Sequence, residues 1–231
     1  MTPGAFAWHD LMSTDPALAA GFYGELFGWA CRNGRFTKDG VAVGGIVALD
    51  PAEGWPSHWL PYVSVEDVDA TVGRAMAHGG LPLLPPAETP DGGRFAVLAD
   101  PGGAVFAVLS GDVPPVATGA IAWDELLTDD AAVRGFYTKA LGYTAGVADM
   151  GPLGAGWVLK QGGAPRATIL ASELASPPAW VAYVQVADVA AAAAKAEELG
   201  GRVVMPPVEV EGVGTLALVE DPTGALLGLM T

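Results

Sequence analysis

The sequence predicts an α+β protein of two tandem domains, each built from two βαβββ units. Two observations support this prediction. The first is an internal duplication, in which residues of the first copy recur at one constant offset: Trp59, Asp67, Gly79-Gly80 and Asp100-Pro101 match Trp180, Asp188, Gly200-Gly201 and Asp221-Pro222. The second is that strand-like and helix-like segments follow one another in the same order in both copies.

Each copy opens with a predicted strand and helix. The strands cover residues 6–12 and 121–127, which makes Trp8 equivalent to Trp123. The first helix is expected between an acidic start, Asp15, and a glycine end, Gly28; its counterpart in the second copy follows Asp129. Aspartate before a helix, alanine within it and glycine after it are signals of a helix of about 12 residues.

Short strands joined by glycine and proline turns are expected next, over residues 41–49 in the first copy and 157–160 and 167–171 in the second. The second half of the first copy predicts a strand over 61–65, a helix over 67–78 and strands over 81–85, 94–98 and 104–109. We therefore predict one domain over residues 1–111, a linker over 112–118 that contains Pro114-Pro115, and a second domain over 119–231.

Composition excludes several classes of function. The net charge of −15 opposes binding to nucleic acid or to anionic lipid. The single cysteine, Cys31, cannot form an internal disulfide bond, and no apolar run reaches the roughly 20 residues that span a bilayer. With no signal-peptide pattern at the start, we expect a cytoplasmic protein that has no membrane or nucleic-acid partner.

The repeated motifs resemble the vicinal oxygen chelate superfamily, which holds glyoxalase I, extradiol dioxygenases and the bleomycin resistance proteins. They are Asp15 with Phe22-Tyr23 and Gly28, then Val65-Glu66-Asp67-Val68, Gly79-Gly80 and Asp100-Pro101-Gly102-Gly103, and the second copy carries each in turn. The chain is especially similar to tandem two-domain actinobacterial members. The resemblance implies that each domain is a curved, mostly antiparallel open barrel with helices on the outside.

Enzymes of this superfamily hold a divalent metal with side chains at three strand positions. Counted by the family's spacing, these positions carry Trp8, Leu60 and Ala107 in the first copy and Trp123, Val181 and Gly228 in the second. None of these side chains is a usual ligand for a divalent cation. We therefore expect no metal cofactor, with a nonstandard divalent metal site, made by His58 with Asp10 or Glu125, as the alternative.

The first strands also predict a ligand slot. On a strand of period two, Trp8, Asp10 and Met12 share one face, as do Trp123, Glu125 and Leu127, and His9 faces away from Trp8. Such a slot is apolar and aromatic, with one carboxylate from each copy. The predicted ligand-binding residues are Trp8, Asp10, Met12, Trp55, His58, Leu60, Tyr62, Arg94, Trp123, Glu125 and Tyr183.

The favoured function is metal-free binding of a small hydrophobic or aromatic molecule, such as a natural product or antibiotic, as in drug-sequestering resistance proteins of this fold. The alternative is a glyoxalase-like or dioxygenase-like enzyme, of lyase, isomerase or dioxygenase type. It would use a nonstandard metal, or Asp10 or Glu125 as general base in an apolar pocket. A third possibility is an interaction module with a closed cavity. Because one chain already holds four βαβββ units, we expect a monomer or a homodimer.

Overall fold

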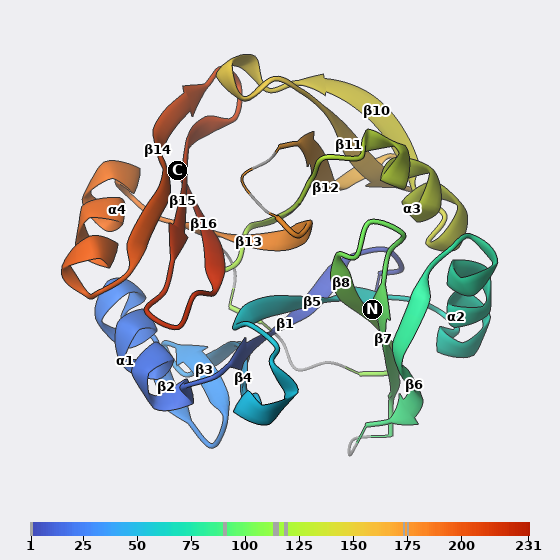
Figure 1. The fold of residues 1–231 in the computed structure, drawn as a ribbon, viewed down its shortest axis with the longest axis horizontal. Coiled ribbons are helices and arrows are strands. Elements are labelled where there is room, and N and C mark those ends of the chain that lie inside the picture. Colours follow the sequence, from blue (N-terminus) through green and yellow to red (C-terminus); the bar gives the residue numbers. More distant parts are fainter. Residues whose placement is uncertain (1, 90–91, 113–115, 118–119, 173, 175) are drawn as a thin grey trace. The chain divides into compact units, whose positions relative to one another are not determined.

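The computed structural model describes residues 2–89, 92–112, 116–117, 120–172, 174 and 176–231 (Figure 1). Parts of the predicted linker, residues 113–115 and 118, therefore lie outside the described residues. The elements of the first repeat are β1 (Phe6–Ser13), α1 (Pro16–Phe27), β2 (Ala30–Arg32), β3 (Arg35–Lys38), β4 (Val41–Ala48), η1 (Pro51–Glu53), β5 (His58–Ser64), α2 (Val68–Ala77), β6 (Leu81–Glu88), β7 (Arg94–Ala99) and β8 (Val105–Ser110).

The second repeat has the same order of strands and α-helices. Its elements are β9 (Trp123–Thr128), η2 (Ala131–Val133), α3 (Arg134–Ala140), β10 (Thr144–Asp149), η3 (Gly151–Leu153), β11 (Ala155–Gln161), β12 (Ala164–Ala171), β13 (Ala179–Gln185), α4 (Val189–Glu198), β14 (Arg202–Val210), β15 (Gly214–Glu220) and β16 (Leu226–Met230). No helix among the described residues is long and apolar enough to cross a membrane.

The strands form two mixed sheets of eight strands, one from each repeat. Their orders are β2-β3-β4-β1-β5-β8-β7-β6 and β10-β11-β12-β9-β13-β16-β15-β14. In both sheets the first strand of each βαβββ unit runs parallel to the last strand of that unit, as β1 does to β4 and β5 to β8. The other pairs within each unit are antiparallel hairpins. The predicted α+β fold of tandem βαβββ units is confirmed.

The predicted helix of about 12 residues is found in the first repeat, where α1 has 12 residues, but the corresponding helix of the second repeat, α3, is shorter. Asp15 caps α1 by accepting a hydrogen bond from the backbone N–H of Leu18, and Pro16 begins the helix. The second repeat has no such proline, its chain enters through the 3₁₀ turn η2, and α3 is only 7 residues long with no side-chain cap. The short strands β2, β3 and β10 were also not predicted as separate strands.

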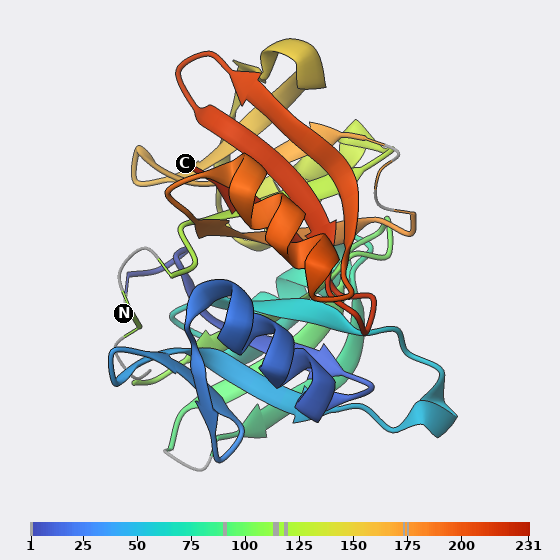
Figure 2. The ribbon, with the colours of Figure 1, turned by 90° about the vertical axis from the view of Figure 1, so that its left-hand side faces the viewer.

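The described chain divides into two compact units that differ from the two sequence repeats. Unit 1 contains Met1–Trp8, Pro61–Val113 and Asp124–Trp180, and unit 2 contains His9–Leu60, Pro114–Trp123 and Val181–Thr231. Each unit therefore combines half of one repeat with half of the other. In unit 1, α2 packs beside α3 (Figure 1), and in unit 2, α1 packs beside α4 (Figure 2). The domain boundaries at residues 111 and 119 stay predictions.

The repeated motif residues meet in the core of each unit. In unit 2, Tyr23 lies between Trp59 and Asp221: the indole Nε1 donates to the Tyr23 hydroxyl at 3.0 Å, and that hydroxyl donates to Asp221 Oδ2 at 3.0 Å. In unit 1 the equivalent contacts, at 2.9 and 2.8 Å, link Trp180, Tyr137 and Asp100. The Tyr, Trp and Asp residues that recur in both repeats are thus explained by packing and hydrogen bonding in the core.

Candidate functional site

The two faces of β1 differ in burial. His9, Leu11 and Ser13 are buried, while the alternate residues Trp8, Asp10 and Met12 are only half-buried. Leu11 belongs to the hydrophobic core of unit 2. The alternation follows from the period of two in a strand. The predicted sharing of one face by Trp8, Asp10 and Met12 therefore agrees with the burial along β1.

In unit 2, the Asp10 carboxylate lies over a glycine of the neighbouring strand. Asp10 pairs in register with Gly45 of β4, and a Cβ atom on Gly45 would lie 2.1 Å from Asp10 Oδ1. No side chain fits at position 45 without moving Asp10. Arg35 of β3 pairs with the same glycine from the opposite side. The register thus brings an arginine and an aspartate to either side of one glycine.

Sequence reasoning missed Arg35 as a residue near the candidate site. The signal that could have found it is the Gly44-Gly45 pair inside an otherwise apolar strand. Glycine within a strand often marks a place where another group approaches closely. Which residue approaches depends on the register of β3, β4 and β1, and that register is a tertiary property.

The equivalent carboxylate of the second repeat, in unit 1, has a different environment. Glu125 of β9 pairs in register with Thr168 of β12, and the Thr168 hydroxyl donates a 2.7 Å hydrogen bond to Glu125 Oε1. Only 2% of Glu125 is exposed, and Leu127 is fully buried. Thr168 is therefore the strand partner of Glu125, as Gly45 is the strand partner of Asp10 in the first repeat. Glu125 is buried, whereas Asp10 is half-buried.

The three strand positions that the family's spacing predicts for metal ligands carry no side chain that suits a metal ion. Leu60, Ala107 and Val181 are buried apolar residues. At Gly228, in unit 2, the ring of Tyr183 fills the space above the backbone, since a Cβ there would lie 2.3 Å from Tyr183 Cδ1. Among the described residues, no group of three His, Cys, Asp or Glu side chains could hold a metal ion. The donor set does not match a divalent cation.

His58 and Trp55 lie close together in the sequence of unit 2 but in different surroundings. His58 is half-buried at the start of β5, and its Nδ1 is 2.9 Å from the carbonyl oxygen of Pro56. Burial lowers the pKa of His58 below 6.5, because the charged ring loses hydration, and the contact with Pro56 opposes this shift. Trp55 follows η1 with 47% of its surface exposed. An exposed indole of this kind is available to a ligand.

The remaining predicted residues are dispersed. In unit 1, the Tyr62 ring lies 6.4 Å from that of Phe95, and Arg94 is held by Asp69 of α2 through contacts of 2.5 and 2.8 Å. The Arg94 guanidinium is thus engaged in a two-point ion pair with a helix, at the surface. In unit 2, Trp123 is half-buried and Tyr183 is buried. The eleven predicted ligand residues are therefore divided between the two units.

Comparison with known proteins agrees with the fold. The family model described as glyoxalase-like domain matches residues 8–109. The chain is 33% identical to "Putative glyoxylase CFP32" of Mycobacterium tuberculosis, over 96% of this chain and 93% of that protein. It is also 33% identical to "Anthracycline biosynthesis protein DauV" of Streptomyces sp. (strain C5), over 96% of this chain and 91% of the relative.

A solved structure shows the same fold at low identity. The Mn(II)-bound glyoxalase from Novosphingobium aromaticivorans is 17% identical, with a TM-score of 0.65 over 99% of this chain and 82% of that chain. Together with the actinobacterial relatives that match over nearly the whole length, this similarity places the repeated motifs in a known family. The chain belongs to the glyoxalase-like family of the vicinal oxygen chelate superfamily.

Proposed function

We propose that this protein binds a small hydrophobic or aromatic molecule and does so without a metal ion. The observation that supports this best is the half-buried Asp10 carboxylate over Gly45, on a strand face that also carries Met12. A carboxylate in such a place can orient a ligand by accepting a hydrogen bond from it, while the thioether adapts to an apolar surface. Arg35, which pairs in register with the same glycine, adds a donor for a ligand oxygen.

The ligand contacts proposed in unit 2 are Asp10, Met12, Trp55, His58, Leu60, Trp123 and Tyr183, with Arg35 added from the strand register. In unit 1 they are Trp8, Tyr62, Arg94 and Glu125. Aromatic side chains bury large areas and stack on flat ligands, which favours a planar molecule. One relative is named as a protein of anthracycline biosynthesis, and anthracyclines contain a flat aromatic ring system. A cytoplasmic location and a monomeric or homodimeric state belong to the same proposal.

An enzyme is the second candidate. Relatives named as glyoxylases and the nearly complete burial of Glu125 beside the Thr168 hydroxyl favour it. Asp10 or Glu125 would then act as general base on the bound molecule. The other form of this candidate, a nonstandard divalent metal site of His58 with Asp10 or Glu125, has less support, because among the described residues no group of three His, Cys, Asp or Glu side chains could hold a metal ion.

Metal analysis of the purified protein and titration with daunorubicin, an anthracycline, test the proposal. We expect no stoichiometric transition metal, and a saturable quenching of tryptophan fluorescence that weakens about tenfold in Asp10→Asn or Met12→Ala. Leu18→Ala, on the exposed face of α1, serves as the control and should bind as the wild type does.

Two results would overturn the proposal. One is a tightly bound transition metal in each chain whose removal abolishes ligand binding. The other is equal binding by the wild type and the Asp10 and Met12 variants. Mass spectrometry of the incubated ligand separates the two candidates, because only the enzyme yields a new product.

A further inference from the structure

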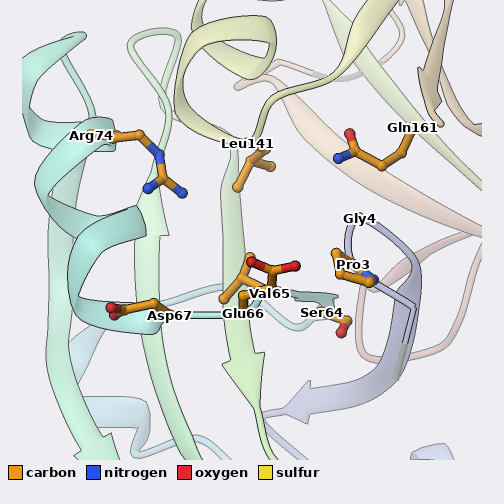
Figure 3. A pocket seen from close by; sticks show the side chains of 9 residues that line it. All are labelled: Pro3, Gly4, Ser64, Val65, Glu66, Asp67, Arg74, Leu141 and Gln161. Carbon is orange, nitrogen blue, oxygen red and sulfur yellow. The ribbon is translucent and has the colours of Figure 1, made fainter.

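A cavity lies in unit 1, apart from the residues proposed above (Figure 3). Its volume is about 230 Å³. It is bounded by the residues before β1, the end of β5 with the start of α2, the end of α3 and the end of β11. The lining residues that carry the argument are Gly4, Glu66, Asp67, Arg74 and Gln161. A cavity of this size holds a few water molecules, at about 30 Å³ each, or a small organic molecule.

Arg74 presents an oriented cation to this cavity. Its Nε donates to the carbonyl oxygen of Ala140 at 3.1 Å, and its Nη2 donates to the Thr71 hydroxyl at 2.8 Å. These contacts fix the guanidinium between α2 and α3 and leave other N–H groups available. Within the part of the chain that the structure describes, no carboxylate forms an ion pair with Arg74. The positive charge is therefore held in place without a neutralising partner.

Glu66 and Gln161 supply the other polar groups. Figure 3 shows the amide of Gln161 and the carboxylate of Glu66 pointing into the space that Arg74 borders. Gln161 Oε1 is buried and has no hydrogen-bond partner among the described residues, and its side chain packs on Gly4. Asp67 differs from Glu66, because its carboxylate caps α2 by accepting a hydrogen bond from Ala70 N–H at 2.9 Å. Glu66 is thus the carboxylate that is free to meet a ligand.

We propose that this cavity binds a small zwitterion of the α-amino-acid type. Its carboxylate would pair with Arg74, which offers the planar N–H groups that suit a carboxylate. Its ammonium group would meet Glu66. The charges on the wall explain this choice: Arg74 and Glu66 offer one charge of each sign, which a zwitterion matches with its two ends, and the third charged group, Asp67, is engaged as the cap of α2. The volume favours a small ligand, since pockets for drug-sized molecules measure roughly 300–1,000 Å³.

The test uses the full chain and the proteinogenic L-α-amino acids, added singly at millimolar concentration. A ligand that binds only the folded state raises the melting temperature with concentration. We expect at least one amino acid to do this and to shift the backbone amide signals of Glu66 and Gln161 in ¹H–¹⁵N spectra. Its N-acetyl derivative, which lacks the ammonium group, and its amide, which lacks the carboxylate, should bind at least tenfold more weakly.

Variants identify the groups that bind. Glu66→Gln changes an exposed side chain and should weaken binding about tenfold without unfolding the protein. Arg74→Gln should weaken it further, with circular dichroism to check the fold because Arg74 also contacts α3. Arg202→Gln, which removes an exposed arginine paired with Glu220 in unit 2, is the matched control and should bind normally.

The proposal fails if no amino acid changes either the melting temperature or the amide signals. It also fails if the N-acetyl derivative binds as well as the free amino acid, or if Glu66→Gln binds as the wild type does. In each of these cases Arg74 and Glu66 act only as solvated surface charges. None of these outcomes bears on the metal-free ligand site, which has no residue in common with the cavity.

Discussion

The hydroxyl of Tyr23 lies 3.0 Å from Oδ2 of Asp221, although the two residues are separated by 198 positions in the chain. Tyr23 belongs to the first repeat and Asp221 to the second, and both are buried in unit 2. Tyr137 and Asp100 form the reciprocal pair in unit 1. Each unit therefore contains a buried hydrogen bond between a tyrosine of one repeat and an aspartate of the other. The duplicated motif is needed in both copies for either unit to be complete.

Removing either hydroxyl should destabilise the fold. In Tyr23→Phe, the Trp59 N–H loses its acceptor and Asp221 Oδ2 loses its donor, both in a buried place. Unsatisfied buried polar groups cost about 1–3 kcal/mol each, so we expect a loss of that order in the free energy of unfolding measured in urea. Tyr137→Phe should behave alike. Tyr62→Phe, at a half-buried tyrosine, is the comparison and should lose less. An equal loss in all three would contradict the role given to the buried networks.

Asp100 should make stability depend on pH. Burial raises the pKa of its carboxyl above 3.8, and the hydrogen bond from Tyr137 offsets part of this shift. A carboxyl whose pKa is higher in the folded than in the unfolded chain stabilises the fold below pH 3.8, and loses that contribution as the pH rises through its folded pKa. The stability of the wild type relative to Asp100→Asn should therefore decrease from about pH 3.8 towards neutrality. Urea unfolding over this range measures it, and an increasing difference would refute the assignment.

For His58 we expect the opposite effect of pH on the stability of the fold. Burial lowers the pKa of its ring below 6.5, so the folded protein favours the neutral form. The contribution of His58 is fully present above pH 6.5 and is lost as the pH falls through the folded pKa. Compared with His58→Gln, which can still donate to the Pro56 carbonyl, the wild type should lose stability on acidification. NMR titration of the ring should give a midpoint below 6.5; a midpoint above it would show that His58 is not buried as described.

Gly45→Ala tests the close approach of Asp10. A Cβ there would lie 2.1 Å from the Asp10 carboxylate, so the carboxylate must move. Overpacking of this kind costs about 1–3 kcal/mol, and we expect that loss in the free energy of unfolding, together with weaker ligand binding. Gly146→Ala in β10, where nothing lies within 4 Å, is the matched strand control and should be nearly neutral.

A double variant shows whether Asp10 is the cause. Asp10→Ala combined with Gly45→Ala should lose less stability than the sum of the single losses, because the first change removes the clash of the second. Strict additivity would mean that the two side chains do not meet.

The sequence alone determined the duplication, the order of strands and helices, and the shared face of Trp8, Asp10 and Met12. These features depend on local signals: the spacing of repeated residues, helix caps and the alternation of a strand. The prediction that the usual metal positions lack donor side chains came from the family's spacing. It overestimated the length of α3, because Asp129 resembles Asp15 but no proline follows it to begin the helix.

Only the tertiary structure decided which residues meet across the chain. Nothing near Tyr23 in the sequence indicates that Asp221, from the other repeat, accepts its hydrogen bond. The cross-strand partner likewise differs between the repeats: Asp10 lies over the backbone of Gly45, and Glu125 accepts a hydrogen bond from the hydroxyl of Thr168. Strand register and the pairing of half-repeats bring these groups together, and they result from packing the whole chain rather than from any local segment.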